Sequence, residues 1–140
     1  MTESRLHFET AILQRYFPKR FLFTKEGRKE VLLVGVKSQS GKVYQIKIEL
    51  SEIYPIEMPT VFIVYPKGLK NFNGKRLPAF NHEMHTLATD ANKVQVCHFL
   101  PGNWNPKQSL YKVILKVKIW LEAYEFYLKT SKPISDYLKN

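Results

Sequence analysis

Residues 97–115 read CHFLPGNWNPKQSLYKVIL and contain the features that decide the fold of this chain. Cys97 is the only cysteine of the sequence, and it comes seven residues before Trp104-Asn105-Pro106. A helix is predicted to start at Ser109, because serine is a favoured N-cap and apolar residues then recur at helical spacing. The sequence therefore predicts a single thiol in a loop that leads into a core helix.

The predicted helix runs from Ser109 to about Thr130 and carries two apolar lines. The first line is expected to face the core; it consists of Leu110, Ile114, Val117, Leu121, Tyr124 and Leu128. The second line, on the opposite side, consists of Leu115, Ile119 and Phe126. Either the last residues of the chain fold back over this second line, or it binds a partner. Lys132, Pro133 and Asp136 favour a loose tail that leaves part of the line exposed.

Upstream of this segment the sequence predicts one helix and then four strands. Residues from Ser4 to Tyr16 are predicted to be helical, with Ser4 as the cap and Phe17-Pro18 at the end. Alternating or apolar runs between turns predict strands at residues 21–23, 31–36, 44–50 and 60–65. The short turns between them favour an antiparallel meander. Residues 66–106 show no convincing regular element, and a connection of that length usually carries function.

Composition predicts one globular domain over residues 1–140, with 44% hydrophobic and 24% charged residues. No apolar run approaches the roughly 20 residues of a membrane helix, and the N-terminus lacks the apolar core of a signal peptide. One unpaired cysteine fits a reducing compartment, so the expected location is the cytoplasm. The net charge of +10 either serves solubility or attracts an acidic partner. The lysines are scattered and no nucleic-acid-reading motif occurs, which favours an acidic protein surface over nucleic acid.

Two segments of the chain resemble the ubiquitin-conjugating enzyme family. Residues 104–115 are similar to the segment that follows the active-site cysteine of that family, with its Trp-Ser-Pro, its Thr/Ser helix start and its Lys-Val-Leu-Leu-like run. Residues 54–62, YPIEMPTVF, resemble the family's Tyr-Pro-Phe-x-Pro-Pro-x-Val-x-Phe.

This resemblance implies the α+β fold called UBC-like: an N-terminal helix, a four-stranded antiparallel meander, a long cysteine-bearing loop and a C-terminal helix. Two departures indicate a bacterial-type member. Eukaryotic members usually have two more C-terminal helices, for which residues 131–140 leave little room. The stretch between the proline pair and the cysteine is also longer than usual.

Cys97 is the expected nucleophile. A thiolate can take an acyl group from an activated carboxyl terminus as a thioester, which reacts with amines yet hydrolyses slowly. The alternative for this residue is a small buried apolar side chain, which is the usual environment of a free cysteine.

Three histidines and one asparagine are the expected assistants of the thiol. His98 follows Cys97 directly, and His82 and His85 lie in NHEMHT, residues 81–86. The resembling family has a His-Pro-Asn motif whose Asn supports the oxyanion; here His85 and Asn92 are the nearest counterparts. An imidazole could lower the pKa of the thiol or act as a general base, or it could only hold the loop in shape. A zinc site of these histidines and Cys97 is disfavoured because no Cys-x2-Cys knuckle organises it, so no metal or other cofactor is expected.

The short form, the paired histidines and the Cys97-His98 step resemble the stand-alone conjugating proteins of CBASS antiphage operons. That resemblance implies a partner: the C-terminus of a cGAS-like cyclic-oligonucleotide synthase, which becomes attached and thereby primed. Two alternatives stay open. One is a carrier of a ubiquitin-like protein in a bacterial ubiquitination-like operon. The other is an inactive binding module of the same fold, similar to RWD domains and to the ubiquitin-binding variants. The sequence also leaves open the need for an activating enzyme and the identity of the final acceptor.

Overall fold

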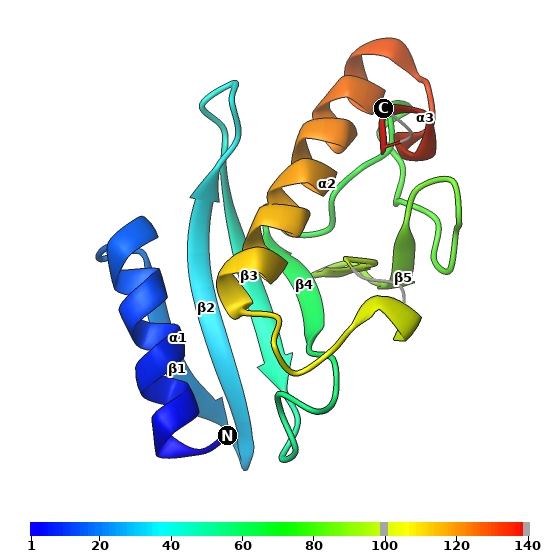
Figure 1. The fold of residues 1–140 in the computed structure, drawn as a ribbon. Helices are drawn as coiled ribbons and strands as arrows, with labels where there is room; N and C mark the ends of the chain where they lie inside the picture. The colour runs from blue at the N-terminus through cyan, green and yellow to red at the C-terminus, as the bar shows by residue number, and fades with distance from the viewer. Residues whose placement is uncertain (99–100, 139–140) are drawn as a thin grey trace.

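The computed structural model describes residues 1–98 and 101–138 and consists of one antiparallel sheet with two long helices packed against it (Figure 1). The elements are α1 (Glu3–Tyr16), β1 (Phe21–Glu26), β2 (Lys29–Lys37), β3 (Val43–Leu50), β4 (Thr60–Tyr65), β5 (Thr86–Thr89), β6 (Val94–Val96), the 3-10 turn η1 (Pro101–Asn103), α2 (Leu110–Thr130) and α3 (Ile134–Leu138). The strand order is β1-β2-β3-β4-β6-β5, and every neighbouring pair is antiparallel.

The first helix and the first four strands confirm the predicted order of elements. β1 to β4 follow one another across the sheet as a meander, in agreement with the short turns between them. The cap of α1 is Thr2 and not Ser4, since the Thr2 hydroxyl accepts the backbone N–H of Arg5 at 3.1 Å. Ser109 caps α2 as predicted, and its hydroxyl accepts the N–H of Lys112 at 3.1 Å.

The prediction of a four-stranded sheet is wrong, because residues 86–96 add a short hairpin. Its turn is closed by Asp90, whose carboxylate accepts the backbone N–H groups of Asn92 and Lys93 at 2.7 and 2.9 Å. β6 then pairs with β4, with Gln95 opposite Phe62. The cysteine therefore does not lie in a long irregular loop; it follows directly after a strand at the interior of the sheet.

The hydrophobic core lies between one face of the sheet and the first apolar line of α2. Leu110, Ile114, Val117, Leu121 and Tyr124 are buried, and Leu128 packs partly against the core, as predicted. The sheet contributes the predicted alternating residues Tyr44, Ile46, Ile48 and Leu50 of β3. The helix α1 adds Leu13 to the same cluster, so both long helices cover one face of the sheet.

The expectation of a loose tail is also wrong, because α3 packs onto the domain. Ile134 is fully buried in the core, and the Tyr137 ring lies 5.4 Å from the Phe126 ring, centroid to centroid. This contact partly covers Phe126, whereas Leu115 and Ile119 remain 37% and 51% exposed. The second apolar line is thus divided into a covered end and an open end.

A buried polar cluster of Arg5, Glu9 and Tyr54 fixes the start of α2. Glu9 is fully buried, and its carboxylate accepts the Tyr54 hydroxyl, the Leu110 N–H at 3.0 Å and the Arg5 Nε–H at 3.2 Å. Arg5 also donates to the carbonyl oxygen of Pro106 at 2.8 Å. The carboxylate therefore satisfies an N–H of the first turn of α2 that has no partner within the helix.

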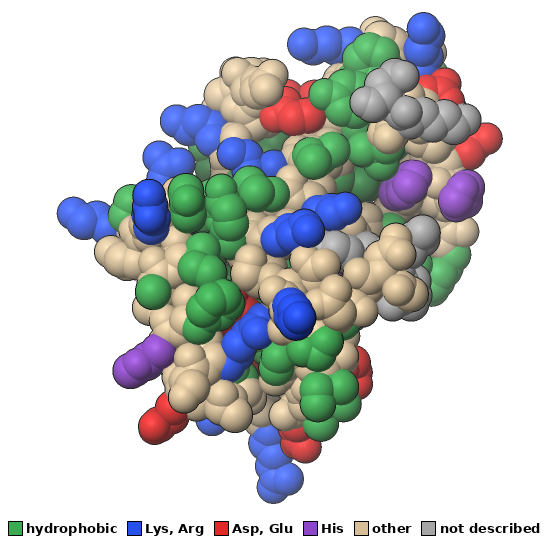
Figure 2. Space-filling model, viewed as in Figure 1, with side chains coloured by type: hydrophobic (Ala, Val, Ile, Leu, Met, Phe, Trp, Pro, Cys, Tyr) green, Lys and Arg blue, Asp and Glu red, His purple; other side chains and the backbone are tan. Residues whose placement is uncertain are grey.

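No helix within the described residues is long and apolar enough to cross a lipid bilayer. Figure 2 shows the lysine and arginine side chains spread over the viewed face, with hydrophobic side chains between them. On this face the positive charge does not gather into a single stripe, in agreement with the scattered lysines of the sequence.

Candidate active site

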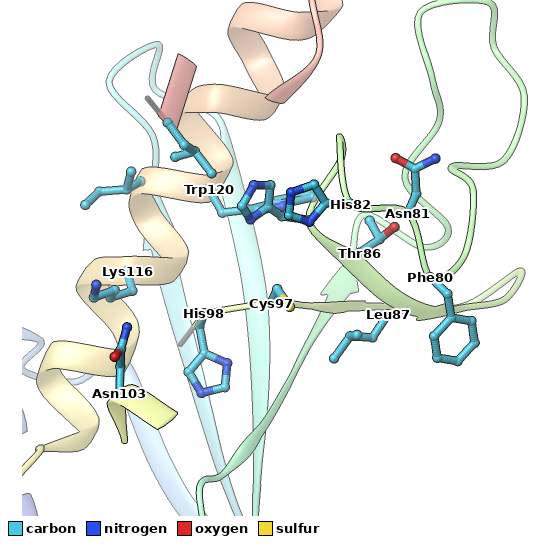
Figure 3. A pocket seen from close by; sticks show the side chains of 13 residues that line it. Phe80, Asn81, His82, Thr86, Leu87, Cys97, His98, Asn103, Lys116 and Trp120 are labelled. Atoms are coloured by element: carbon cyan, nitrogen blue, oxygen red, sulfur yellow. The ribbon is translucent and has the colours of Figure 1, made fainter. Parts of the chain in front are cut away.

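Cys97 is held at the end of β6 by a backbone contact to the segment that carries two of the predicted histidines. Its N–H donates a hydrogen bond of 2.9 Å to the carbonyl oxygen of His85. The side chain is half-buried and lines a cavity of about 690 Å³ between α2 and the β5–β6 hairpin (Figure 3). The only thiol of the chain is thus accessible from a cavity rather than sealed in the core.

The same cavity is lined by all three predicted histidines. His82 and His85 lie with their ring centroids 5.6 Å apart and their planes at 26°, close to parallel. The Asn81 side chain shapes this turn, since its oxygen accepts the Met84 N–H at 3.0 Å. The Met84 carbonyl oxygen in turn accepts the indole N–H of Trp120 at 3.0 Å, which ties the histidine turn to α2.

Burial controls the protonation of the site. It raises the pKa of the Cys97 thiol above its usual value. It also lowers the pKa of His85, with a further contribution from the neighbouring His82. Burial lowers the pKa of His98 to about 4, although a hydrogen bond to the Val96 backbone acts in the opposite direction. Near neutral pH the thiol is therefore mostly protonated, while His85 and His98 are neutral and able to accept a proton.

The structure does not bring Asn92 to the thiol. Asn92 is exposed in the turn between β5 and β6, at the opposite end of β6 from Cys97. Asn92 does not line the cavity that contains Cys97, and the strand Val94–Val96 lies between the two residues. Two other asparagines line the cavity instead, Asn81 before β5 and Asn103 in η1. Asn103 lies between Cys97 and Trp104 in the sequence. That position could have marked Asn103 as a candidate site residue.

The helix α2 contributes side chains to the cavity that the sequence analysis did not assign to the site. They are Lys116 and Trp120, which lie on the α2 side of Cys97 in Figure 3. Ile119, predicted as a partner-binding residue, lines the cavity as well. Spacing along the helix could have grouped Lys116 with Ile119 and Trp120, but only the folded chain shows that this part of α2 faces Cys97.

In the part of the chain that the structure describes, the titratable side chains of the site are not grouped as a metal centre requires. Within residues 1–98 and 101–138, no three His, Cys, Asp or Glu side chains are grouped in a way that could hold a metal ion. His82, His85 and Cys97 line the same cavity without meeting at one point.

The sequence profile of one protein family, described as "Type II CBASS E2 protein", matches residues 9–133. This range includes Glu9, the histidine turn, Cys97 and the whole of α2. None of the curated proteins is similar enough to match the chain. Because the family match spans most of the sequence, the chain belongs to the family of type II CBASS E2 proteins.

Proposed function

We propose that this protein is a conjugating enzyme of the UBC-like fold in which Cys97 forms a thioester with the C-terminal carboxyl group of another protein. The observation that carries the proposal is the place of the thiol. Cys97 opens into a cavity together with three histidines, directly before the segment that leads into α2. A cysteine whose role is only to fill space in the core would lie among apolar side chains.

Contact between the two segments that resemble ubiquitin-conjugating enzymes supports the UBC-like fold. The indole N–H of Trp104 donates to the carbonyl oxygen of Pro55 at 2.9 Å, and the Tyr54 and Trp104 rings lie 6.3 Å apart. The order of a helix, four sequential strands, the cysteine and a long helix is also that of the family which these segments resemble.

The reaction consists of two acyl transfers. First, Cys97 Sγ attacks the carbonyl carbon of an activated carboxyl terminus; a C–S bond forms and the activating group leaves with the electron pair of the broken bond. The thiol proton passes to an imidazole of the cavity, for which His85 and His98 are the candidates because their lowered pKa values keep both neutral near pH 7. A lowered pKa also weakens an imidazole as a base, so His98, with a pKa of about 4, is the poorer candidate. Second, an amine attacks the thioester carbonyl, the C–N bond of an amide forms and the C–S bond breaks; the proton lost by the amine returns the Cys97 sulfur to a thiol.

The type II CBASS family supports a cGAS-like cyclic-oligonucleotide synthase as the acyl donor. Conjugation of its C-terminus would attach and prime the synthase for the antiphage response. The net charge of +10 fits an acidic partner surface. An activating enzyme, or an acyl donor that is already activated, is required because a free carboxylate does not react with a thiol.

The test is incubation of the protein with a cGAS-like synthase whose C-terminus is already activated as a thioester, followed by a non-reducing gel and intact-mass analysis. The wild type should carry a thiol-sensitive adduct on Cys97. Cys97→Ser should carry an ester that resists thiols, because an alkoxide is a poorer leaving group than a thiolate. Cys97→Ala should carry none, and an adduct that persists in Cys97→Ala would contradict the assignment of the nucleophile.

The same experiment separates the two alternative functions. A carrier of a ubiquitin-like protein would show a Cys97 adduct only when that protein replaces the synthase. An inactive binding module would bind the synthase equally well as the wild type and as Cys97→Ala, and neither protein would form an adduct.

A further inference from the structure

Phe80 has an exposed aromatic side chain and an unfavourable backbone conformation. Its side chain is 76% exposed, and its backbone has φ of 49°, in the left-handed region that non-glycine residues rarely adopt. The conformation is held by the N–H of Phe80, which donates to the carbonyl oxygen of Leu87 in β5 at 2.8 Å. Outliers of this kind, when they persist, tend to occur at binding sites.

The exposed ring belongs to the wall of the cavity that contains Cys97. Phe80 and Leu87 lie on the hairpin side of the thiol in Figure 3. Ile119 contributes a half-exposed apolar side chain from α2 to the same cavity. The cavity thus has apolar side chains from both of the elements between which it lies.

The size of the cavity restricts what can enter it. A volume of about 690 Å³ is typical of pockets for small ligands and cannot admit a folded domain. It can admit the last few residues of an extended chain. Lys116 lines the cavity one helical turn before Ile119, so a carboxylate on that chain is favoured over an ammonium group.

We propose that Phe80, Leu87 and Ile119 form an apolar clamp that selects acyl donors with a bulky apolar side chain next to the C-terminal residue. The inference rests on the proposed thioester at Cys97. A donor whose terminal carbonyl carbon lies at Sγ places its penultimate side chain a few ångströms away, within reach of the cavity walls. The clamp therefore determines which C-terminus is taken, in addition to the surface contacts between the folded partners.

The probe is a set of short acidic peptides that end in a glycine thioester and differ only in the penultimate residue, which is Leu in one and Ala in the other. Thiol–thioester exchange forms the bond between Cys97 Sγ and the acyl carbon and releases the original thiol, so neither ATP nor an activating enzyme is needed. Intact mass gives the rate of acylation. We expect the Leu peptide to acylate Cys97 about tenfold faster than the Ala peptide, as burial of a large apolar side chain implies.

Phe80→Ala should reduce this preference to about threefold or less. Phe8→Ala is the matched control, since Phe8 is 48% exposed on α1 and does not line the cavity; it should retain the full preference. Equal acylation by both peptides in the wild type would overturn the clamp and leave the proposed function intact. Failure of every peptide to acylate Cys97 would overturn the proposed function, and the clamp with it.

Discussion

The backbone N–H of Cys97 and the carbonyl oxygen of His85 form a hydrogen bond of 2.9 Å. His85 has φ of 51°, so its backbone is in the left-handed region while it holds the thiol-bearing residue. The backbone of His85 positions Cys97, whereas its imidazole lines the cavity, so a substitution can remove the imidazole and keep the backbone contact. Asparagine is the replacement of choice at this position, because it tolerates the left-handed conformation and removes the imidazole.

His85→Asn is expected to slow the acylation of Cys97 by about a hundredfold, if the neutral imidazole accepts the thiol proton during attack. Alkylation by iodoacetamide at a pH above the raised pKa of the thiol should change by less than about twofold, because the thiol is then already ionised. Both rates are measured by intact mass.

His82→Asn is the comparison variant for this experiment, since its ring stacks on that of His85 but is exposed. A smaller effect of His82→Asn would identify His85 as the base. Unchanged acylation in His85→Asn would show that its imidazole takes no part in the transfer.

His98 should make the protein less stable in mild acid. Its pKa is about 4 in the folded protein against 6.5 in the unfolded chain. As the pH falls from about 6.5 to about 4, the unfolded chain binds a proton that the folded protein does not, so the free energy of unfolding decreases. Over this window the wild type should lose on the order of 2 kcal/mol of unfolding free energy through His98, allowing for partial exposure of the ring. The His98→Gln variant cannot titrate at this position and should not show that loss.

The measurement is urea unfolding of the wild type and His98→Gln at several pH values in this window. His7→Gln, at an exposed position of α1, is the matched control for the substitution itself. If the free energy of unfolding depends on pH identically in the wild type and in His98→Gln, His98 is not the source of the acid sensitivity.

Glu9→Ala should destabilise the fold by about 3 kcal/mol, because it leaves Arg5, Tyr54 and the first turn of α2 without their buried acceptor. Glu9→Gln should cost less, since the amide oxygen can still accept the Leu110 N–H. Urea unfolding measures both, with the exposed Glu57→Ala as a control expected to change stability by less than about 0.5 kcal/mol. A loss in Glu9→Ala no larger than that of the control would disprove a structural role for the cluster.

The divided apolar line of α2 predicts opposite outcomes for two similar substitutions. Ile119→Asp should leave the melting temperature nearly unchanged and weaken association with the synthase by about tenfold or more, because Ile119 is half-exposed at the cavity. Phe126→Asp should instead destabilise the domain by roughly 1–2 kcal/mol through loss of the contact with Tyr137 in α3. Calorimetry of binding and thermal unfolding distinguish the two. Unfolding of Ile119→Asp would show that this end of the line belongs to the core.

Most of the fold was predictable because its signals are local. The helix α2 begins after Ser109 and ends at Thr130 as its cap and its apolar spacing predict. The alternation from Tyr44 to Leu50 predicted the buried face of β3. The order of Cys97, Trp104 and the start of α2 could also be read from the sequence, since these residues lie close together along the chain.

Other features depend on partners that are distant in the sequence. β5 and β6 have four and three residues, too few for a recognisable period, and β6 exists because β4 offers it a pairing edge at Phe62. Glu9 reads as an ordinary helix residue until Tyr54 and Leu110 surround it.

The candidate site shows the same division between local and tertiary information. The sequence by itself determined which residues are candidates for the chemistry, because a single cysteine, three nearby histidines and a Trp-x-Pro segment are properties of the chain. Only the tertiary structure decided which side chains share a cavity. It placed Lys116, Ile119 and Phe80 around the thiol, and it left Asn92 beyond the other end of β6. The physical reason is that side-chain proximity across a cavity results from the packing of α2 against the hairpin, and no local spacing encodes that packing.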